Sequence, residues 1–487
     1  MRRLIAPRIA EGGVGDEPSG STRAGGTMRI KRVEVQNLFG MFDHVIPFNL
    51  GDRITIMHGA NGLGKTAILK MINGFFNSRY SDLRSTPFKE FRIDFEDESV
   101  IVISKGRSNS GESEREGDSS SELAIEYRKP GEPARLEIIR TPQRPEELGF
   151  LFRHLEEAIP GLSRIGPDSW RVAQTGEILS IEELVENYSE FLPFHLYSSE
   201  KLPLFERATR GNPDWLKEIK TGFNVRFIET QRLMTMARPG RKSRHEAASI
   251  LTPAVARYSS ELAALIQRRL AEYATLSQVL DRSFPMRVIE QGPQSVRSID
   301  QLREKLASLE EKRARLREAG VLDKETHPYF NDRIPSNVEE STTNVLSVYA
   351  DDVEKKLNVF SEVSRLIELL KQFIKDHFLN KELAVDKERG FYLYSTETKE
   401  ELTPTQLSSG EQHELVLINE LLFRTKPNTL FLIDEPEISL HVDWQLQFLQ
   451  DLQNVIALSP FDVLLATHSP LIINERWDLA VELAVKK

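Results

Sequence analysis

The segment Gly59–Thr66 (GANGLGKT) constrains what this chain can fold into more than any other part of it. It matches the pattern G-x-x-x-x-G-K-[ST] and lies between the apolar run ITIMH, which predicts a strand, and a predicted helix. Glycines let backbone N–H groups curl around phosphate oxygens, and a helix N-terminus adds partial positive charge. The sequence therefore predicts a strand, a phosphate-binding loop and a helix in succession. A plain glycine-rich turn is the alternative, and this context disfavours it.

The side chains of this loop are expected to hold a nucleotide, ATP, and its metal ion. Lys65 is expected to reach the β- and γ-phosphates, and the hydroxyl of Thr66 is expected to bind Mg²⁺. The other residues expected to line the phosphate site are Gly59, Asn61, Gly62, Gly64 and Ala67.

A second motif, TLFLIDE at Thr429–Glu435, predicts a buried strand with two acidic residues at its end. Asp434 is expected to bind Mg²⁺, directly or through water, and Glu435 to orient or deprotonate the attacking water. Such a pair is often only a solvated strand end. The phosphate-binding loop elsewhere in the chain favours the catalytic interpretation.

Three further motifs carry weaker signals. The run LSSGEQ places Ser408 and Gly410 before a predicted helix, where a serine and Glu411 would also serve as an ordinary helix cap. His468, in LLATHSP, follows an apolar strand and could sense a γ-phosphate, although a lone histidine there is more often structural. Gln231 ends the run VRFIETQ, where its amide could contact the metal ion and the attacking water.

The composition of the 487 residues excludes several classes of protein. A formal net charge of −10, from 74 acidic and 64 basic residues, argues against a surface coated with nucleic acid but allows a local basic patch. The chain has no cysteine, which excludes disulfides and cysteine-based zinc sites and fits a reducing cytoplasm. No apolar run approaches the roughly 20 residues that cross a bilayer, so we expect a cytoplasmic protein without a membrane span.

Strands alternating with helices predict an α/β fold, interrupted by a helical insertion. The expected parts are a disordered extension at 1–27 (with Met28 an alternative start), the first part of a head at 28–249, a helical insertion at 250–385 and the second part of the head at 386–487. The insertion has apolar residues at three-four spacing, which are Ile299, Leu302, Leu306 and Leu309, then Leu346, Tyr349 and Val353. These helices either form a short coiled-coil-like arm or lie on the core of the head.

The order of these motifs resembles ABC-type ATPases, and more narrowly the branch that contains SMC, RecF and OLD-like proteins. The opening strand IKRVEVQNLFG is similar to that of this branch, and the run EISLH is familiar from its OLD-like and RecF-like members. The resemblance implies an ABC-type P-loop ATPase head with a β-rich lobe and an inserted helical arm. It also implies ATP hydrolysis with Mg²⁺ and a head-to-head homodimer. In that dimer, Ser408 and Gly410 of one head contact ATP held by Lys65 of the other.

The sequence departs from the pattern of ABC proteins at four positions. Ser409 replaces the second glycine of the signature, and Glu411 replaces the glutamine of transporters, as in SMC-like heads. Phe39 stands where the branch often has a basic residue, which weakens any DNA contact there. His441 stands where transporters have an aspartate. These differences favour the SMC-like branch over a transporter subunit.

The resemblance is compatible with more than one cellular process driven by ATP hydrolysis. OLD-like enzymes continue from the histidine motif into a nuclease domain, whereas only 470–487 follow it here. This arrangement resembles the stand-alone ATPase subunits of the prokaryotic anti-phage systems PARIS and Septu, which implies a separate effector protein, a nuclease. The alternative is a RecF-like DNA-repair ATPase, for which a basic cluster could contact phosphates, formed by Arg238, Arg241, Lys242 and Arg244.

Overall fold

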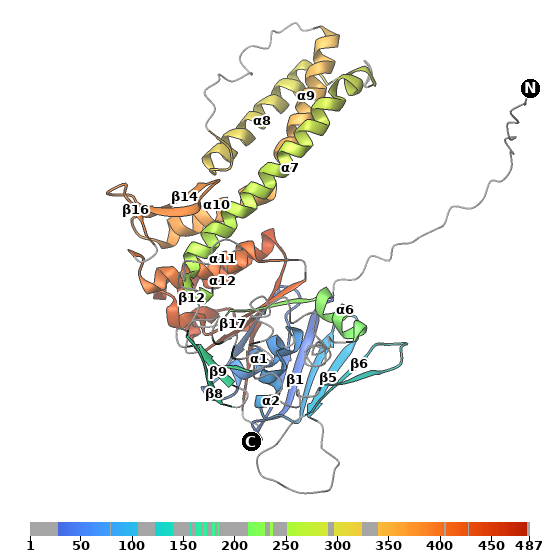
Figure 1. Cartoon of the computed structure of the whole chain (residues 1–487), viewed down its shortest axis with the longest axis vertical. Helices are drawn as coiled ribbons and strands as arrows, with labels where there is room; N and C mark the ends of the chain where they lie inside the picture. The colour runs from blue at the N-terminus through green and yellow to red at the C-terminus, as the bar shows by residue number, and fades with distance from the viewer. Residues whose placement is uncertain are drawn as a thin grey trace, which may run out of the picture.

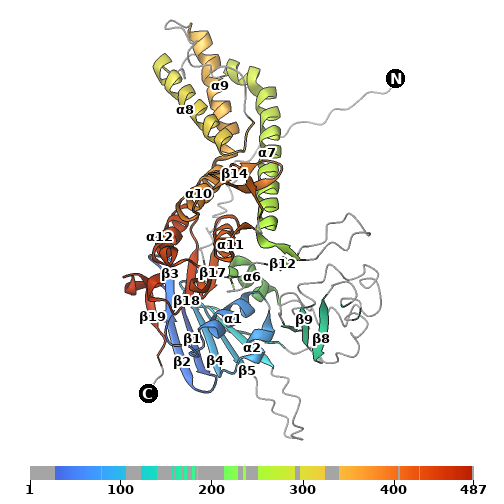
Figure 2. The same ribbon diagram turned by 90° about the vertical axis from the view of Figure 1, so that its left-hand side faces the viewer.

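A five-stranded parallel sheet forms the centre of the head in the computed structural model (Figures 1 and 2). Its strands follow the order β11-β17-β18-β3-β19. Their bounds are Asn224–Ile228 for β11, Thr429–Asp434 for β17, Asp462–Thr467 for β18, Ile54–His58 for β3 and Ala480–Glu482 for β19. Every residue of β17 is buried, as expected for a parallel strand that is covered on both faces.

The structure describes residues 28–77, 79–105, 122–139, 161–166, 169–172, 178–180, 213–228, 234–236, 251–290, 297–323, 339–403, 406–426 and 428–484, together with residues 153, 156 and 184. The predicted disordered extension at 1–27 lies outside the described residues.

The register of the parallel sheet brings distant parts of the sequence to one edge. Asp434 at the end of β17 pairs with Ala466 of β18, and Thr467 of β18 pairs with His58 of β3. Because parallel strands end at the same edge, the residues that follow β3, β17 and β18 meet there.

A six-stranded antiparallel sheet and the helix α1 (Lys65–Phe76) cover one face of the parallel sheet. The antiparallel order is β2-β1-β4-β5-β6-β7. The bounds are Phe42–Pro47 for β2, Ile30–Leu38 for β1, Glu90–Phe95 for β4, Val100–Lys105 for β5, Leu123–Arg128 for β6 and Arg135–Ile139 for β7. Side chains of α1 pack in one buried cluster with side chains of both sheets, such as Val35 of the antiparallel sheet and Leu432 of the parallel sheet. Figure 2 shows α1 beside the strands of both sheets.

Two helices cover the opposite face of the parallel sheet. These are α11 (Ser409–Phe423) and α12 (Val442–Leu458). Neighbouring residues of β17 alternate between the two cores: Leu432 belongs to the cluster with α1, and Phe431 belongs to the cluster with α11 and α12. This alternation follows from the two-residue period of a strand.

Four of the described helices make up the insertion, and three of them project from the head as an arm (Figure 1). The four helices are α7 (Ala254–Glu290), α8 (Ile299–Glu318), α9 (Glu340–Asn358) and α10 (Ser361–His377). Most of the predicted stripe on α8 is buried, namely Leu302, Leu306 and Leu309, whereas Ile299 at the start of the helix is partly exposed. The stripe predicted for α9 was wrong at Tyr349, which is 40% exposed, and the neighbouring Ala350 is buried instead.

Both structural interpretations of the insertion hold for different parts of it. The distal parts of α7, α8 and α9 project together as an arm, whereas α10 and the start of α7 pack on α11 (Figures 1 and 2). Ion pairs join the arm helices, such as Arg287 with Asp352 between α7 and α9 and Lys305 with Asp351 between α8 and α9.

A small antiparallel sheet lies between the arm and the head. Its order is β14-β15-β16, with bounds Lys381–Asp386, Gly390–Ser395 and Glu401–Leu402. Its hairpin packs against α7 so closely that a Cβ on Gly390, whose φ is 83°, would lie 1.8 Å from the carbonyl oxygen of Ser259. A glycine is therefore required at this turn.

The remaining elements are short. They are α2 (Tyr80–Ser85), α6 (Asp214–Gly222), α13 (Pro470–Ile473), the 3₁₀ turns η7 (Pro436–Ser439) and η8 (Trp477–Leu479), and the strands β8 (Leu162–Gly166), β9 (Ser169–Val172), β10 (Ile178–Ser180), β12 (Met234–Met236) and β13 (Leu251–Pro253). Among the helices that the structure describes, none is long and apolar enough to cross a membrane. The predicted α/β fold class, with a β-rich lobe and a helical insertion, is confirmed.

Candidate functional site

The phosphate-binding loop adopts a backbone that needs its glycines. Gly62 and Gly64 have φ values of 86° and 89°, and Gly59 has a φ of 154°. A Cβ on Gly59 would lie 2.8 Å from the carbonyl oxygen of Leu483, and one on Gly64 would lie 2.5 Å from Cδ2 of Leu38. The loop leads directly into α1, whose N-cap is Gly64, so the first backbone amides of this helix, which include those of Thr66 and Ala67, are not capped by a side chain.

The ammonium group of Lys65 lies inside the site rather than in solvent. Its Nζ donates to the carbonyl oxygens of Gly59 at 2.9 Å and Ala60 at 3.1 Å, and it lies 3.3 Å from Nδ1 of His468. The residue is only 5% exposed. Burial lowers the pKa of Lys65, although the nearby carboxylates of Glu435 and Asp434 act in the opposite direction.

Thr66 and Asp434 meet at the centre of the site. The hydroxyl of Thr66 donates to both carboxylate oxygens of Asp434, at 3.1 and 3.0 Å. Asp434 is 6% exposed, and burial raises its pKa. Two hard oxygen donors therefore face each other beside a phosphate-binding loop, and such donors suit Mg²⁺.

His468 lies between Lys65 and Glu435. Its Nε2 is 3.1 Å from Oε1 of Glu435, and its Nδ1 faces Lys65. Because an ammonium group only donates and a carboxylate only accepts, both contacts are satisfied by a neutral imidazole with its proton on Nε2. The strand order explains the arrangement, since β18 lies between β3 and β17.

Glu435 adopts an unusual backbone conformation. Its φ and ψ are 44° and 57°, the left-handed region, and its N–H donates to the carbonyl oxygen of Ala466 at 2.9 Å. For a residue other than glycine this conformation costs about 1–3 kcal/mol, and such strain is concentrated at functional sites. It turns the chain sharply from β17 into η7 directly after the second acidic residue.

Sequence reasoning missed Glu437. Its Oε1 accepts hydrogen bonds from the hydroxyl of Thr467 at 2.8 Å and from the backbone N–H groups of His468 at 2.7 Å and Ser469 at 3.2 Å. Its Oε2 is buried and has no hydrogen-bond partner among the described residues. Glu437 therefore holds the segment that carries His468. The available signal was a second glutamate in the run DEPE, two residues after Glu435.

The LSSGEQ segment forms the start of α11, on the molecular surface. Ser408 is the N-cap, and it forms a capping box with Glu411, as the alternative interpretation anticipated. Ser408 is exposed and Gly410 is partly exposed. Within the described part of the chain, neither residue has a hydrogen bond to the phosphate-binding loop of the same molecule.

Two of the predicted features cannot be placed. Gln231 lies outside the described residues, as does the basic cluster at 238–244. Among the residues that are described, there is no group of three or more His, Cys, Asp or Glu side chains that could hold a metal ion. The pair of Thr66 and Asp434 is compatible with this, because Mg²⁺ is often held by few protein ligands together with phosphate oxygens.

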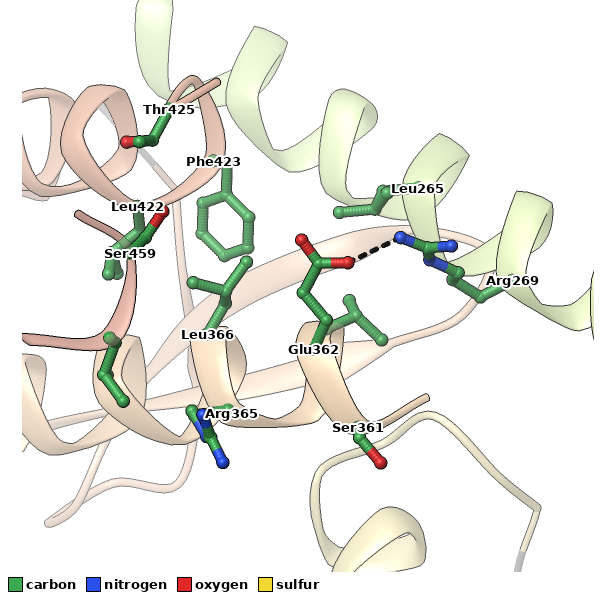
Figure 3. Close-up of a pocket in the computed structure, with 12 residues that line it drawn as sticks. Leu265, Arg269, Ser361, Glu362, Arg365, Leu366, Leu422, Phe423, Thr425 and Ser459 are labelled. Atoms are coloured by element: carbon green, nitrogen blue, oxygen red, sulfur yellow. Dashed lines mark hydrogen bonds and ion pairs between the residues drawn. The ribbon is translucent and has the colours of Figure 1, made fainter. Parts of the chain in front are cut away.

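A separate cavity of about 350 Å³ lies at the base of the arm, between α7, α10, α11 and α12 (Figure 3). It is lined by apolar side chains such as Leu265 and Phe423, and by the ion pair of Arg269 with Glu362, whose atoms are 2.7 Å apart. None of the predicted site residues lines this cavity.

Comparisons with known proteins agree with the motifs. Residues 28–473 match the model of the family described as AAA ATPase domain. No curated protein matches the chain.

Three solved SMC structures are similar to the chain. One is the Smc head domain with an extended coiled coil from Pyrococcus furiosus, bound to the C-terminal domain of ScpA (14% identity, 94% of each chain covered, TM-score 0.31). Another is the SMC head domain from Thermotoga maritima (11% identity, 93% of this chain and 92% of that chain covered, TM-score 0.28). The third is the Smc head domain with a coiled coil and joint from Pyrococcus yayanosii (11% identity, 92% of this chain and 93% of that chain covered, TM-score 0.28). The family match spans the whole region from the first strand through the histidine motif, and the chain therefore belongs to the AAA ATPase domain family and is an ATPase.

Proposed function

We propose that ATP is hydrolysed where the phosphate-binding loop meets the ends of β17 and β18. The observation that carries this proposal is the chain of contacts from Lys65 to His468 at 3.3 Å and from His468 to Glu435 at 3.1 Å. Lys65 binds the β- and γ-phosphates together with the amides at the start of α1. Glu435 orients and deprotonates the attacking water, and His468 contacts the γ-phosphate.

Thr66 and Asp434 are the residues that would hold Mg²⁺. Burial already raises the pKa of Asp434, so a cation beside this carboxylate would offset the cost of its negative charge. The bound ion would neutralise charge on the phosphate oxygens. Gln231 is proposed to contribute its amide to the same metal ion and to the attacking water.

Nucleotide binding would change the contacts of Lys65. Its ammonium group now binds the carbonyl oxygens of Gly59 and Ala60, which are neutral acceptors. Phosphate oxygens carry full negative charge and form stronger, charge-assisted hydrogen bonds. We expect the ammonium group to exchange its carbonyl contacts for phosphate, which would also loosen its contact with His468.

A head-to-head homodimer would complete the site. Four exposed apolar side chains lie on η7, α12 and α13, elements that follow Glu435 or His468 in the chain, and we name them the dimer patch: Ile438, Val442, Leu446 and Leu471. They are 64%, 54%, 41% and 39% exposed, respectively. Exposed apolar groups of this kind mark interaction surfaces. The exposed Ser408 and the partly exposed Gly410 would contact ATP held by Lys65 of the second copy.

A mixing experiment tests the shared site. Lys65→Ala removes the phosphate contact, and Ser408→Arg places a bulky charge where the second copy would contact ATP. Each variant alone is expected to be inactive. A mixture regains ATPase activity, because a mixed dimer has one site with both residues intact. Two inactive variants that stay inactive when mixed, or a Ser408→Arg variant with the wild-type rate, would contradict the shared site.

We also propose that ATP hydrolysis controls a separate effector, a nuclease, in prokaryotic anti-phage defence. The support is the resemblance to the stand-alone ATPase subunits of PARIS and Septu. The test incubates the protein with plasmid and phage DNA, Mg²⁺ and ATP, with and without the product of the neighbouring gene. Cleavage only in the presence of that product supports the proposal. Salt-dependent and ATP-dependent DNA binding without cleavage would favour the RecF-like alternative.

A further inference from the structure

One ion pair connects the sheet beneath the arm to the start of α11. Lys381 is the first residue of β14, and its Nζ lies 2.6 Å from Oε1 of Glu411. Both side chains are mostly buried, with exposed fractions of 21% and 17%. Water therefore screens this pair less than it screens an ion pair on the open surface.

The same carboxylate also holds Ser408. Oε2 of Glu411 accepts from the backbone N–H of Ser408 at 2.9 Å and from its hydroxyl at 3.0 Å. The hydroxyl of Ser408 in turn accepts from the N–H of Glu411 at 3.3 Å. Burial on its own would raise the pKa of Glu411, but the contacts with Lys381 and Ser408 outweigh it and leave this pKa below its ordinary value. One carboxylate thus joins Lys381 to Ser408.

The hairpin that carries Lys381 is attached to the arm. The hydroxyl of Ser259 on α7 donates to the carbonyl oxygens of Arg389 at 2.8 Å and Phe391 at 2.7 Å, and Gln267 on α7 donates to that of Lys387 at 2.8 Å. The end of α8 is equally close, because a Cβ on Gly320 would lie 1.9 Å from the carbonyl oxygen of Val385. A rigid-body movement of α7 and α8 would carry this hairpin with it.

We propose that Lys381 is a positioning residue for the ATPase site: it holds Glu411, and thereby Ser408, in the geometry that contacts ATP on the second head, and it transmits movements of the arm to that contact. This inference depends on the proposed shared site. Lys381 does not touch the nucleotide. If Lys381 loses its charge, Glu411 loses a charge-assisted hydrogen-bond donor to one of its carboxylate oxygens. The side chain of Glu411 is then freer to move away from Ser408.

The experiment compares three variants of the full-length protein. Lys381→Met removes the charge, and Glu411→Gln keeps a side chain that can form a capping box but cannot pair with Lys381. We expect either change to lower kcat about tenfold, a coupling of ordinary size, and to leave the affinity of the single head for a fluorescent ATP analogue unchanged. The control is Lys399→Met in the turn between β15 and β16, whose exposed ammonium group lies over the ring of Tyr394 in the same small sheet, and it should keep the wild-type kcat.

Three further variants separate positioning from a structural effect. The double variant of Lys381→Met and Glu411→Gln should be no slower than either single variant, because both remove the same interaction. Lys381→Arg should restore most of kcat. Ser259→Ala, which loosens the hairpin from α7, should lower kcat in the same direction. Melting temperatures establish that all variants are folded.

The outcomes distinguish the positioning role of Lys381 from the shared ATP site on which it depends. If Ser408→Arg is inactive and regains activity on mixing with Lys65→Ala, but Lys381→Met has the wild-type kcat, the positioning role is wrong and the shared site stands. If Ser408→Arg itself keeps the wild-type rate, the shared site is wrong. Additive losses in the double variant would also overturn the inference.

Discussion

His468 and Glu435 are joined through Nε2 and Oε1, which lie 3.1 Å apart, although the two residues belong to different strand ends. The imidazole has its other nitrogen toward Lys65 at 3.3 Å, so it connects the residue proposed to bind phosphate with the residue proposed to activate water. A neutral histidine satisfies both contacts. This relationship gives each of these side chains a separate and measurable role.

Glu435→Gln is expected to lower kcat about 10²- to 10⁴-fold, the usual contribution of a general base. The amide keeps an oxygen that accepts from Nε2 of His468, so the geometry is retained and only basicity is lost. ATP binding should persist, and light scattering after size exclusion should show a dimer that accumulates with ATP. The matched control is Glu475→Gln, an exposed glutamate on the same head. Unchanged turnover in Glu435→Gln would assign the base elsewhere, with His468 examined next.

Lys65→Ala is expected to abolish ATP binding and hydrolysis without unfolding the protein. Burial lowers the pKa of Lys65, so the folded state gains little from this charge in the absence of phosphate. The melting temperature should stay within about 2 °C of the wild-type value, since no apolar core is lost. Fluorescence titration with an ATP analogue gives the affinity, and circular dichroism gives the fold. Wild-type hydrolysis in this variant would contradict the phosphate-binding assignment.

Asp434→Asn is expected to stabilise the protein while it removes activity. Because burial raises the folded-state pKa of Asp434, its ionised form opposes folding at every pH above that value. As the pH falls through the raised folded-state pKa toward the ordinary value of 3.8, the folded state binds the proton first and the penalty disappears. Asparagine cannot ionise, so it avoids the penalty.

The measurement is the difference in melting temperature between Asp434→Asn and wild type at pH 8 and at pH values approaching 4, without nucleotide or Mg²⁺. The gain should be on the order of 1–2 °C at pH 8 and should shrink on acidification. A variant that is less stable than wild type at pH 8 would show that the carboxylate is stabilised by its neighbours instead.

Glu437→Ala is expected to lower both stability and kcat. It leaves the N–H of His468 and the hydroxyl of Thr467 without their acceptor, which costs about 1–3 kcal/mol in the free energy of unfolding. The displaced His468 should lower kcat more than it raises KM. Glu437→Gln keeps one accepting oxygen and should recover much of the rate. Urea titration and steady-state kinetics check both statements, and an unchanged kcat in Glu437→Ala would show that His468 needs no support from this carboxylate.

Local patterns were sufficient for the parts of the fold that are contiguous in the chain. The strand, loop and helix around Gly59–Thr66, and the buried strand that ends at Asp434, formed as predicted because neighbouring residues alone specify them. The stripe on α8 was also predicted from its spacing. At Tyr349 the same spacing failed, because the buried face of α9 depends on which helices pack beside it, and spacing does not specify the neighbours.

The sequence by itself determined which residues would form the glycine-rich loop, the acidic strand end and the helices of the insertion, since backbone preference and apolar period act over a few residues. Only the tertiary structure decided that β18 lies between β3 and β17, which places His468 between Lys65 and Glu435. The hydrogen bonds of Glu437 and the ion pair of Lys381 with Glu411 likewise depend on how elements pack. The physical reason is that strand order and helix docking are set by the burial of whole surfaces, a property of the assembled chain that no local pattern encodes.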